Sequence, residues 1–255
     1  MQAPDALFGL AEAYLDDLEL TRDLGAQQQS MRYALEGGKR IRAVICLATA
    51  EAAGCEPEAA LPAAAALELV HAFSLVHDDL PALDDDDERR GRPSAHVAFG
   101  EGVALLAGDA LLAEAFRLAL TYPTTAPARE LAEATLGMIG GQYLDIVGDH
   151  EDLADVHRLK TGRLFAASVG LALWVADVPG PSQLPWRAFG EELGLLFQIV
   201  DDVLDGDGYA ERLGPDAARD LARDAAERAH SALEEIPADT SVLRAIVEDL
   251  VVRTA

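Results

Sequence analysis

The chain has 255 residues, half of them hydrophobic, so it is long enough to bury a substantial core. Its 20 lysines and arginines stand against 45 aspartates and glutamates, and the net charge of -25 makes a nucleic-acid backbone an unsuitable partner. Cys46 and Cys55 show neither a metal-ligand spacing nor a paired framework, which favours a reducing cytoplasm over secretion. We expect no signal peptide in MQAPDALFGL and no transmembrane helix, because no uninterrupted apolar run reaches about 18 residues.

Helical periodicity runs along the sequence, and no stretch alternates apolar and polar residues for long enough to predict a strand. Alanine and leucine dominate while aromatic residues make up 5%, a composition typical of helical proteins. No repeat of fixed length divides the chain, so residues 1–255 are expected to form one all-α domain. The expected helices cover residues 5–20, a short segment that ends at Gly37, 41–53, a segment that has Pro62 near its start and runs to Asp79, 100–120, 126–148, 150–176 with a kink at 160–162, 186–205, 216–235 and 240–253.

The segment GGKRIR is the first one with unusual chemistry. Gly37 and Gly38 end a short helix, and Lys39, Arg40 and Arg42 follow at the start of the next helix. Cations at this position oppose the helix dipole, whereas the free N–H groups of the same helix end attract an anion. Lys39 and Arg42 are three residues apart, so both can face one ligand. The pattern favours a diphosphate-binding segment over surface decoration.

The stretch HAFSLVHDDLPALDDDDERRGR, from His71 to Arg92, combines carboxylates with guanidinium groups. A largely apolar helix ends in Asp78 and Asp79, and further aspartates and arginines follow. Most charge runs are solvated surface, but a buried helix that ends in unpaired carboxylates is costly unless cations meet them. Carboxylates suit Mg²⁺, which proteins usually share with substrate phosphates, and arginine forks hold the remaining phosphate oxygens. His71 lies two turns before Asp78 on the same face, where it is either a phosphate donor or an ordinary core histidine.

A second acidic cluster closes the predicted helix 186–205, in FQIVDDVLD. Asp201 and Asp205 are four residues apart, so their carboxylates stack on one face and repel each other unless a cation bridges them. The following Gly-Asp-Gly lacks the ligand series and the closing glutamate of a calcium loop. Lys39 and Lys160 are the only lysines in a chain that otherwise uses arginine, which suggests places where a compact ammonium is needed.

In this order and spacing, the motifs resemble those of the all-trans polyprenyl diphosphate synthases over essentially the whole chain. HDDLPALDDDDERRGRPSAH resembles the first aspartate-rich motif of that family, and FQIVDDVLD resembles the second. The four-residue gap between Asp79 and Asp84 is similar to that of bacterial short-chain members, notably farnesyl diphosphate synthases. The resemblance implies an antiparallel helix bundle around a central cavity, usually as a homodimer, which uses three Mg²⁺ ions.

The resemblance also implies a reaction and a set of roles. An allylic diphosphate ionises, isopentenyl diphosphate attacks the resulting cation, and a proton is then lost without any protein nucleophile. The residues implied to bind Mg²⁺ are Asp78, Asp84, Asp201 and Asp205, and those implied to act with them in catalysis are Asp79, Asp202 and Lys160. Isopentenyl diphosphate would be held by Lys39, Arg42, His71 and Arg90. The allylic diphosphate would be held by Arg89, Lys160, Thr161 and Gln198.

Product length is expected to depend on what closes the cavity. Phe73 and Ser74 lie five and four residues before Asp78, about one turn deeper at a rise of ~1.5 Å per residue. An aromatic residue with a small neighbour at this place resembles bacterial farnesyl diphosphate synthases, so farnesyl diphosphate is the predicted product. Geranylgeranyl or geranyl diphosphate is the alternative, and Phe73 as an ordinary core residue is the competing interpretation.

One segment departs from the family pattern. Members usually carry a lysine-bearing segment after the second motif, whereas GDGYAERLGP, from Gly206 to Pro215, is short and has Arg212 as its only cation. This departure motivates a rival hypothesis, a non-catalytic subunit that binds prenyl diphosphates. A class I terpene cyclase is a third possibility, but its second metal motif normally mixes Asn, Ser or Thr with Glu. Two intact aspartate motifs and a second cationic segment favour the prenyltransferase.

Overall fold

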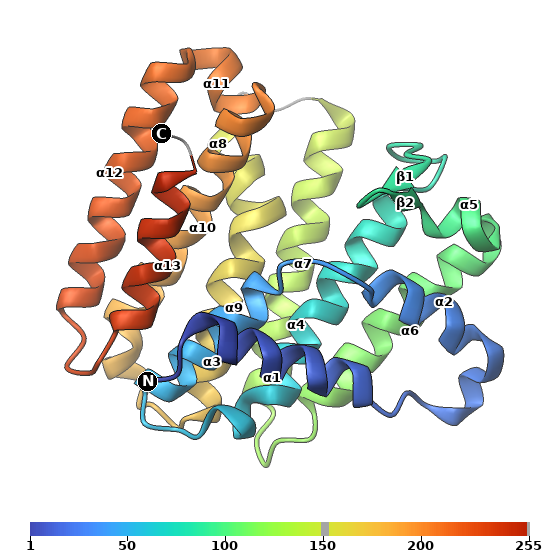
Figure 1. Ribbon diagram of the computed structural model, residues 1–255, viewed down its shortest axis with the longest axis horizontal. Coiled ribbons are helices and arrows are strands. Elements are labelled where there is room, and N and C mark those ends of the chain that lie inside the picture. Colours follow the sequence, from blue (N-terminus) through green and yellow to red (C-terminus); the bar gives the residue numbers. More distant parts are fainter. Residues whose placement is uncertain (149–152, 254–255) are drawn as a thin grey trace.

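The computed structural model describes residues 1–148 and 153–253. Its elements are almost all helices, which confirms the all-α prediction (Figure 1). The helices are α1 (Pro4–Asp17), α2 (Gln28–Leu35), α3 (Ile41–Ala52), α4 (Pro57–Asp78), α5 (Ala95–Phe99), α6 (Glu101–Ala119), α7 (Ala126–Val147), α8 (Leu153–His157), α9 (Arg163–Val175), α10 (Leu184–Asp205), α11 (Gly208–Leu213), α12 (Pro215–Glu234) and α13 (Ser241–Val252). Tighter 3-10 turns cover Arg22–Gln27 and Gly180–Gln183, and a wider π turn covers Arg158–Gly162.

Helix α4 is the centre of the bundle, packed against α3, α6 and α9 (Figure 1). It begins at Pro57, and Pro62 lies early in the helix, as expected. Proline is tolerated at the first helical position because the N–H it lacks would have no intrahelical acceptor there. By length and composition alone α4 could cross a membrane, but 67% of its apolar window is buried inside the protein. Its apolar character is therefore that of a core helix.

The kink expected at residues 160–162 is present as the π turn Arg158–Gly162, which joins α8 to α9. The expected helix 150–176 includes residues 150–152, which lie outside the described residues. Gly141 of α7 faces this turn, and a β-carbon there would lie 2.3 Å from the Lys160 backbone nitrogen. Glycine at position 141 therefore lets α7 and the turn approach each other closely.

A small hairpin corrects the expectation that the chain has no strand. β1 (Glu88–Arg89) pairs antiparallel with β2 (Arg92–Pro93). Arg90 and Gly91 join them, both with positive φ, as a two-residue hairpin turn requires. Strands of two residues are too short to show an alternating pattern, so periodicity could not reveal them.

Helices α4 and α10 carry the two aspartate motifs at their C-terminal ends. α10 packs between α9 and α12, and α13 lies against α10 and α12. The C-terminal ends of α4 and α10 both lie at the upper end of the bundle in Figure 1. Each aspartate motif thus lies where its helix ends, at the same end of the bundle.

Candidate active site

A cavity of about 560 Å³ opens between α4, α6, α7 and the π turn. One part of its lining is polar, because it includes the last turn of α4 and the start of α3. The other part is apolar and lies deeper along α4. The lining includes Arg42, His71, Phe73, Ser74, His77, Asp78, Asp109, Leu112, Met138, Lys160 and Thr161.

The first aspartate motif divides into exposed and paired carboxylates. Asp78 lines the cavity, and burial together with the neighbouring Asp84 raises its pKa to about 6, against the opposing effect of Lys160. The Asp84 backbone N–H donates to the Asp78 carbonyl at 2.9 Å, which folds the intervening loop back onto the helix end. Asp79 is 2% exposed and instead accepts hydrogen bonds from Arg89, with the Nε at 2.9 Å. Asp78 and Asp84 are therefore open to a cation, while Asp79 already has one.

The second motif divides in the same way. Burial raises the pKa of Asp201 to about 6, and Asp205 adds to the effect while Lys39 and Arg42 oppose it. The adjacent Asp202 is 2% exposed and accepts from the Gln198 Nε2 at 2.7 Å and from the Tyr209 backbone N–H at 2.8 Å. Asp202 thus holds α11 to the end of α10.

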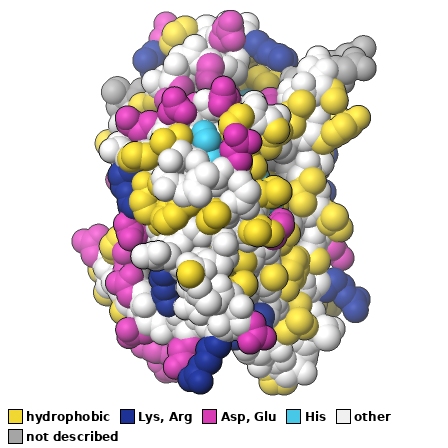
Figure 2. All heavy atoms as spheres, turned by 90° about the vertical axis from the view of Figure 1, so that its right-hand side faces the viewer, with side chains coloured by type: hydrophobic (Ala, Val, Ile, Leu, Met, Phe, Trp, Pro, Cys, Tyr) yellow, Lys and Arg dark blue, Asp and Glu magenta, His cyan; other side chains and the backbone are white. Residues whose placement is uncertain are grey.

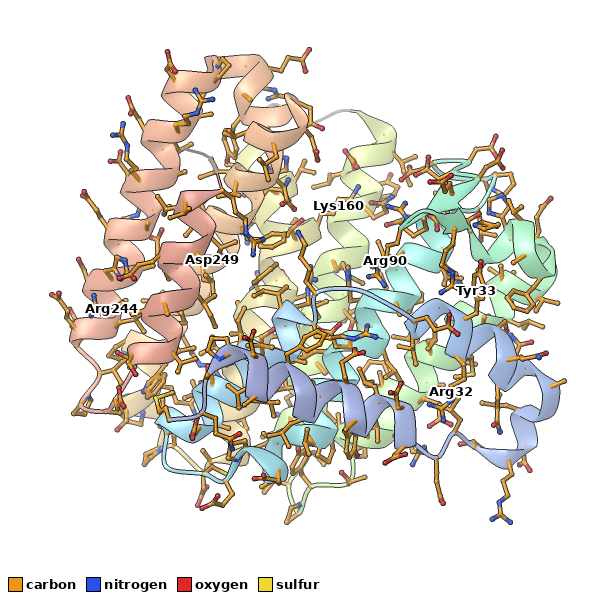
Figure 3. The ribbon with its side chains drawn as sticks, viewed as in Figure 1. Arg32, Tyr33, Arg90, Lys160, Arg244 and Asp249 are labelled. Atoms are coloured by element: carbon orange, nitrogen blue, oxygen red, sulfur yellow. The ribbon has the colours of Figure 1, made fainter. Side chains whose placement is uncertain are left out.

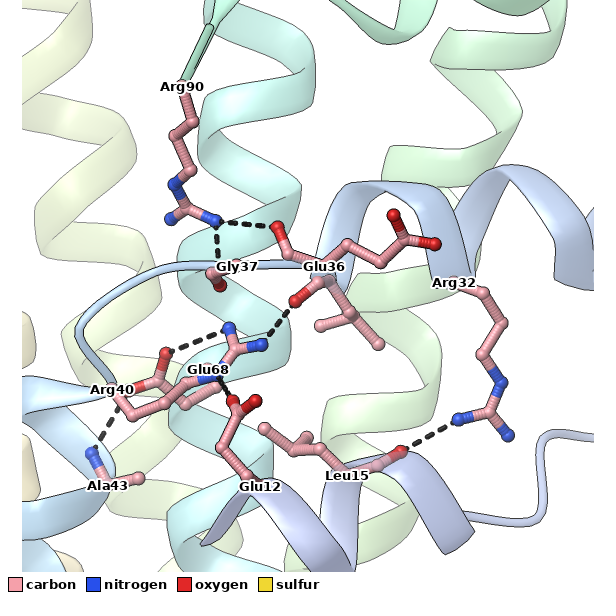
Figure 4. A network of polar contacts seen from close by, with 10 residues as sticks. Glu12, Leu15, Arg32, Glu36, Gly37, Arg40, Ala43, Glu68 and Arg90 are labelled. Atoms are coloured by element: carbon pink, nitrogen blue, oxygen red, sulfur yellow. Dashed lines mark hydrogen bonds and ion pairs between the residues drawn. The ribbon is translucent and has the colours of Figure 1, made fainter. Parts of the chain in front are cut away.

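Within GGKRIR, Arg40 and Arg42 have different environments. Arg40 is bonded to Glu12 of α1 and to the Leu35 carbonyl, and its Nη1 lies 3.8 Å from Glu68 of α4 (Figure 4). Arg42 lines the cavity and stacks over the Phe165 ring at 4.6 Å. Its Nε is buried and has no hydrogen-bond partner among the described residues. A buried donor without an acceptor is costly unless a ligand supplies one, so the Arg42 guanidinium is available to an anionic ligand.

His71 and Arg90 lie close enough to Arg42 to interact with it electrostatically. Burial and the charges of Arg42 and Arg90 lower the pKa of His71 well below its usual value, so its imidazole is neutral. Arg90 donates from Nη1 to the Gly37 carbonyl at 3.1 Å and to the Glu36 carbonyl at 3.3 Å (Figure 4). Gly38 has a φ of +102°, and a β-carbon there would lie 3.0 Å from the Arg90 guanidinium. Glycine is thus needed at position 38 both for its backbone and for this contact.

Lys160 connects the cavity with a neighbouring one. Its Nζ lies 2.5 Å from the Asp145 carboxylate of α7, and Figure 3 shows the side chain in the upper central part of the molecule. Lys160 and Thr161 line both the main cavity and an adjacent cavity of about 350 Å³, which is also lined by Gln198, Asp202 and Arg212. The turn therefore presents its lysine where both aspartate motifs are close by.

The deeper end of the cavity is apolar. Phe73 is 7% exposed and lines the cavity together with Leu112 and Met138. Ser74 lines it as well, with its hydroxyl donating to the His71 carbonyl at 2.9 Å. Both residues predicted to affect product length thus border this space.

A model of the polyprenyl synthetase family matches residues 26–249 of the chain. The chain belongs to the polyprenyl synthetase family. It is 42% identical over 208 residues to a geranylgeranyl diphosphate synthase of Cyanophora paradoxa, covering 75% of this chain and 69% of that one. It is 37% identical over 227 residues to the farnesyl diphosphate synthase of Bacillus subtilis, covering 83% and 76%.

Two further relatives, one compared by sequence and one by structure, are also similar to this chain. The chain is 44% identical over 216 residues to the large subunit 1 of a heterodimeric geranylgeranyl pyrophosphate synthase of Arabidopsis thaliana. That match covers 77% of this chain, which spans 58% of the subunit's length. The crystal structure of a geranyltransferase from Legionella pneumophila superposes with a TM-score of 0.88 at 30% identity, over 98% of this chain and 96% of that one. The chain is a prenyltransferase of the short-chain all-trans type, and its relatives make products of two lengths.

The metal of this prenyltransferase family, Mg²⁺, suits the donor set. Asp78 and Asp201 are partly buried carboxylates, and burial together with neighbouring aspartates raises their pKa values, so a bound divalent cation would stabilise their charged forms. Within residues 1–148 and 153–253, no cluster of three metal-ligating side chains is formed. Mg²⁺ commonly takes only one or two carboxylates and completes its shell with water and substrate phosphates, so the arrangement fits.

Several cavity residues escaped sequence analysis. Gln142 and Tyr143 of α7 line the cavity. His77 and Asp109 line it too. The sequence position of His77 could have identified it as a cavity residue. It directly precedes Asp78 and lies four residues after Phe73, so it lies on the same face of α4 as Phe73.

Proposed function

We propose that this prenyltransferase condenses isopentenyl diphosphate with dimethylallyl or geranyl diphosphate and releases mainly farnesyl diphosphate. The observation that carries the product assignment is Phe73, an almost fully buried aromatic side chain at the cavity lining about one helical turn below Asp78. A longer prenyl chain would need the space that this ring occupies. Geranylgeranyl diphosphate is the second candidate product, since relatives named for it are as similar as those named for farnesyl diphosphate.

The carboxylates at the two helix ends would hold the metal. In this proposal Asp78 and Asp84 bind Mg²⁺ from the α4 side, and Asp201 and Asp205 bind a third ion from the α10 side. When bound, Mg²⁺ neutralises the diphosphate leaving group and so favours cleavage of the allylic C–O bond. The buried, charge-crowded setting of Asp78 and Asp201 supports these assignments.

The cationic residues would divide between two diphosphates. Lys39, Arg42, His71 and Arg90 hold isopentenyl diphosphate, and the buried Arg42 Nε without an acceptor supports this assignment. The residues assigned to the allylic diphosphate are Arg89, Lys160, Thr161 and Gln198. Asp79 and Asp202 act indirectly in this scheme, because Asp79 orients Arg89 and Asp202 orients Gln198.

Protein groups then position the reactants while the bonds change. The allylic C–O bond breaks and its electron pair leaves with the diphosphate. The double bond of isopentenyl diphosphate attacks the allylic carbon, and a proton passes to the departed diphosphate as the new double bond forms. The apolar side chains of the deep cavity exclude water that would otherwise capture the cation.

We further propose that the chain acts as one domain, as a cytoplasmic homodimer. Large apolar side chains are exposed along α6 and α7, and Figure 2 views the molecule from the α5–α6 side with hydrophobic groups gathered on it. An apolar surface of this kind usually marks a contact with another chain. The residues concerned are Val103, Leu105, Leu106, Leu136, Ile139, Tyr143, Ile146 and Val147. Light scattering coupled to gel filtration would detect twice the 27.1 kDa mass of one chain, and a monomer at micromolar concentration would contradict this part of the proposal.

The decisive experiment is incubation of the purified protein with Mg²⁺, isopentenyl diphosphate and each allylic primer, followed by separation of the products by chain length. Farnesyl diphosphate as the main product supports the proposal, and geranylgeranyl diphosphate supports the second candidate. Absence of turnover with every primer, from a protein that unfolds cooperatively, would favour the non-catalytic subunit. Omission of Mg²⁺ is the matched control.

A further inference from the structure

The ring of His77 packs against the ring of Phe73. The two residues are one helical turn apart on α4, so their side chains lie on the same face. Their ring centroids are 4.8 Å apart and the planes meet at 71°, an edge-to-face arrangement. Both residues line the 560 Å³ cavity. One side of the Phe73 ring is therefore held by another ring of the same helix.

Helix α6 fixes the position of His77. The His77 Nε2 lies 3.0 Å from the Leu105 carbonyl, so Nε2 carries the proton and donates it to that oxygen. The Asp109 carboxylate lies 3.9 Å from the same nitrogen. Between these two residues lies Gly108, where a β-carbon would be only 2.1 Å from the His77 Nε2. A glycine at this position of α6 creates the room that the imidazole occupies.

These contacts connect α6 to the part of α4 that closes the cavity. Phe73 is 7% exposed, and the imidazole fills the space between its ring and Gly108. If the imidazole were removed, the Phe73 side chain could adopt another rotamer in the vacated space towards α6. The cavity would then become deeper without any change in Phe73 itself.

We propose that His77 is a positioning residue that holds Phe73 across the cavity and thereby limits the length of the prenyl chain that the enzyme releases. The proposal rests on the proposed function, since it deepens the specificity of that same site. A purely structural role for His77 would alter stability but not product length. The two roles therefore differ in what a substitution does to the products.

The test compares His77→Ala with the wild type in product distribution and in thermal stability. His77→Ala is expected to raise the ratio of longer to shorter products by about 2- to 10-fold, the range that loss of one aromatic pair contact implies. His77→Phe, which retains a ring against Phe73, is expected to stay closer to the wild-type distribution. His230→Ala is the matched control, because His230 lies on α12 beside Arg244, away from the cavity residues.

A second variant addresses the same contact from the other helix. Gly108→Ala places a methyl group where the imidazole lies, so it should displace His77 from the Phe73 ring and change the product ratio from that of the wild type without altering the sequence of α4. An unchanged product ratio in both His77→Ala and Gly108→Ala, with lowered thermal stability, would overturn the proposal. An equal shift in His230→Ala would overturn it as well.

A structural measurement keeps the two proposals apart. If the wild-type protein makes no product, the proposed function fails, and the crystal structure of His77→Ala still tests the role of His77. A Phe73 side chain rotated towards α6 supports the positioning role. A Phe73 side chain in its original rotamer, with the space left by the imidazole empty or filled by water, contradicts it.

Discussion

Asp79 at the end of α4 and Arg89 of β1 form an ion pair, with the Arg89 Nε 2.9 Å from the Asp79 carboxylate. Arg89 also reaches Asp86 at 3.1 Å. Asp78, the residue before Asp79, forms no side-chain hydrogen bond or ion pair within the described ranges and lines the cavity. Two adjacent aspartates thus have different tasks, which substitutions can separate.

Asp78→Asn should lower kcat by about 10²- to 10³-fold, as loss of one electrostatic group at a reacting centre typically does. It should leave the metal-free protein as stable as the wild type or more so, because it removes a partly buried charge without a partner. Asp79→Asn should instead destabilise the fold by about 1–3 kcal/mol, less than a fully buried pair because Arg89 is 36% exposed. Chemical denaturation and steady-state kinetics measure the two effects. Equal effects of the two variants on both quantities would contradict the division.

Arg40 and Arg42 offer a second matched pair. Arg42→Gln should raise KM for isopentenyl diphosphate by about 10- to 100-fold, since a charged hydrogen bond to a buried ligand is of that strength. Arg40→Gln should lower the melting temperature, because it leaves Glu68 without a buried cation. Kinetics and thermal unfolding of both variants test this. The assignment fails if Arg40→Gln has the larger effect on KM while its fold remains stable.

The neutral state of His71 predicts a pH dependence of stability. Its pKa is lower in the folded chain than in the unfolded chain, so the unfolded state binds more protons as the pH falls below about 6.5. His71 therefore contributes stability above that pH, and the contribution is lost as the pH falls further. Replacement by Gln should make the free energy of unfolding fall less steeply between pH 7 and 5. Urea titrations of both proteins at each pH measure the difference, and parallel curves would exclude a lowered pKa.

Arg212 is the only cation in the short segment after the second motif. Together with Lys160 it lines the smaller cavity of about 350 Å³. Arg212→Gln should raise KM for the allylic diphosphate by about 3- to 10-fold, a modest effect because the side chain is exposed. KM for isopentenyl diphosphate should not change. Arg219→Gln on the outer part of α12 is the control, and similar KM values in all three proteins would show that α11 does not contact the substrate.

Phe73→Ala should lengthen the products from the same primers, because removal of the ring deepens the cavity. It should also cost about 3–5 kcal/mol of stability, the usual range for a buried Phe→Ala change. Chain-length analysis together with thermal unfolding measures both. Unchanged products from a stable variant would show that another side chain closes the cavity.

Sequence reasoning was most accurate where the signal is local. Helical periodicity predicted the long helices and the kink at Lys160, because both depend on neighbouring residues along one element. The hairpin around Arg90 was not foreseen, because its strands have only two residues each.

The sequence by itself determined the all-helical fold and the presence of two aspartate clusters and a cationic segment. Only the tertiary structure decided which members of each group are paired. Arg40 is engaged by Glu12 and Glu68, and Asp79 by Arg89, whereas Arg42 and Asp78 remain available to a ligand. His77 likewise gained its place from Leu105 and Gly108 on another helix. Such partners lie far apart in the chain or on other helices, so no local pattern of residue types encodes them, and packing alone brings them together.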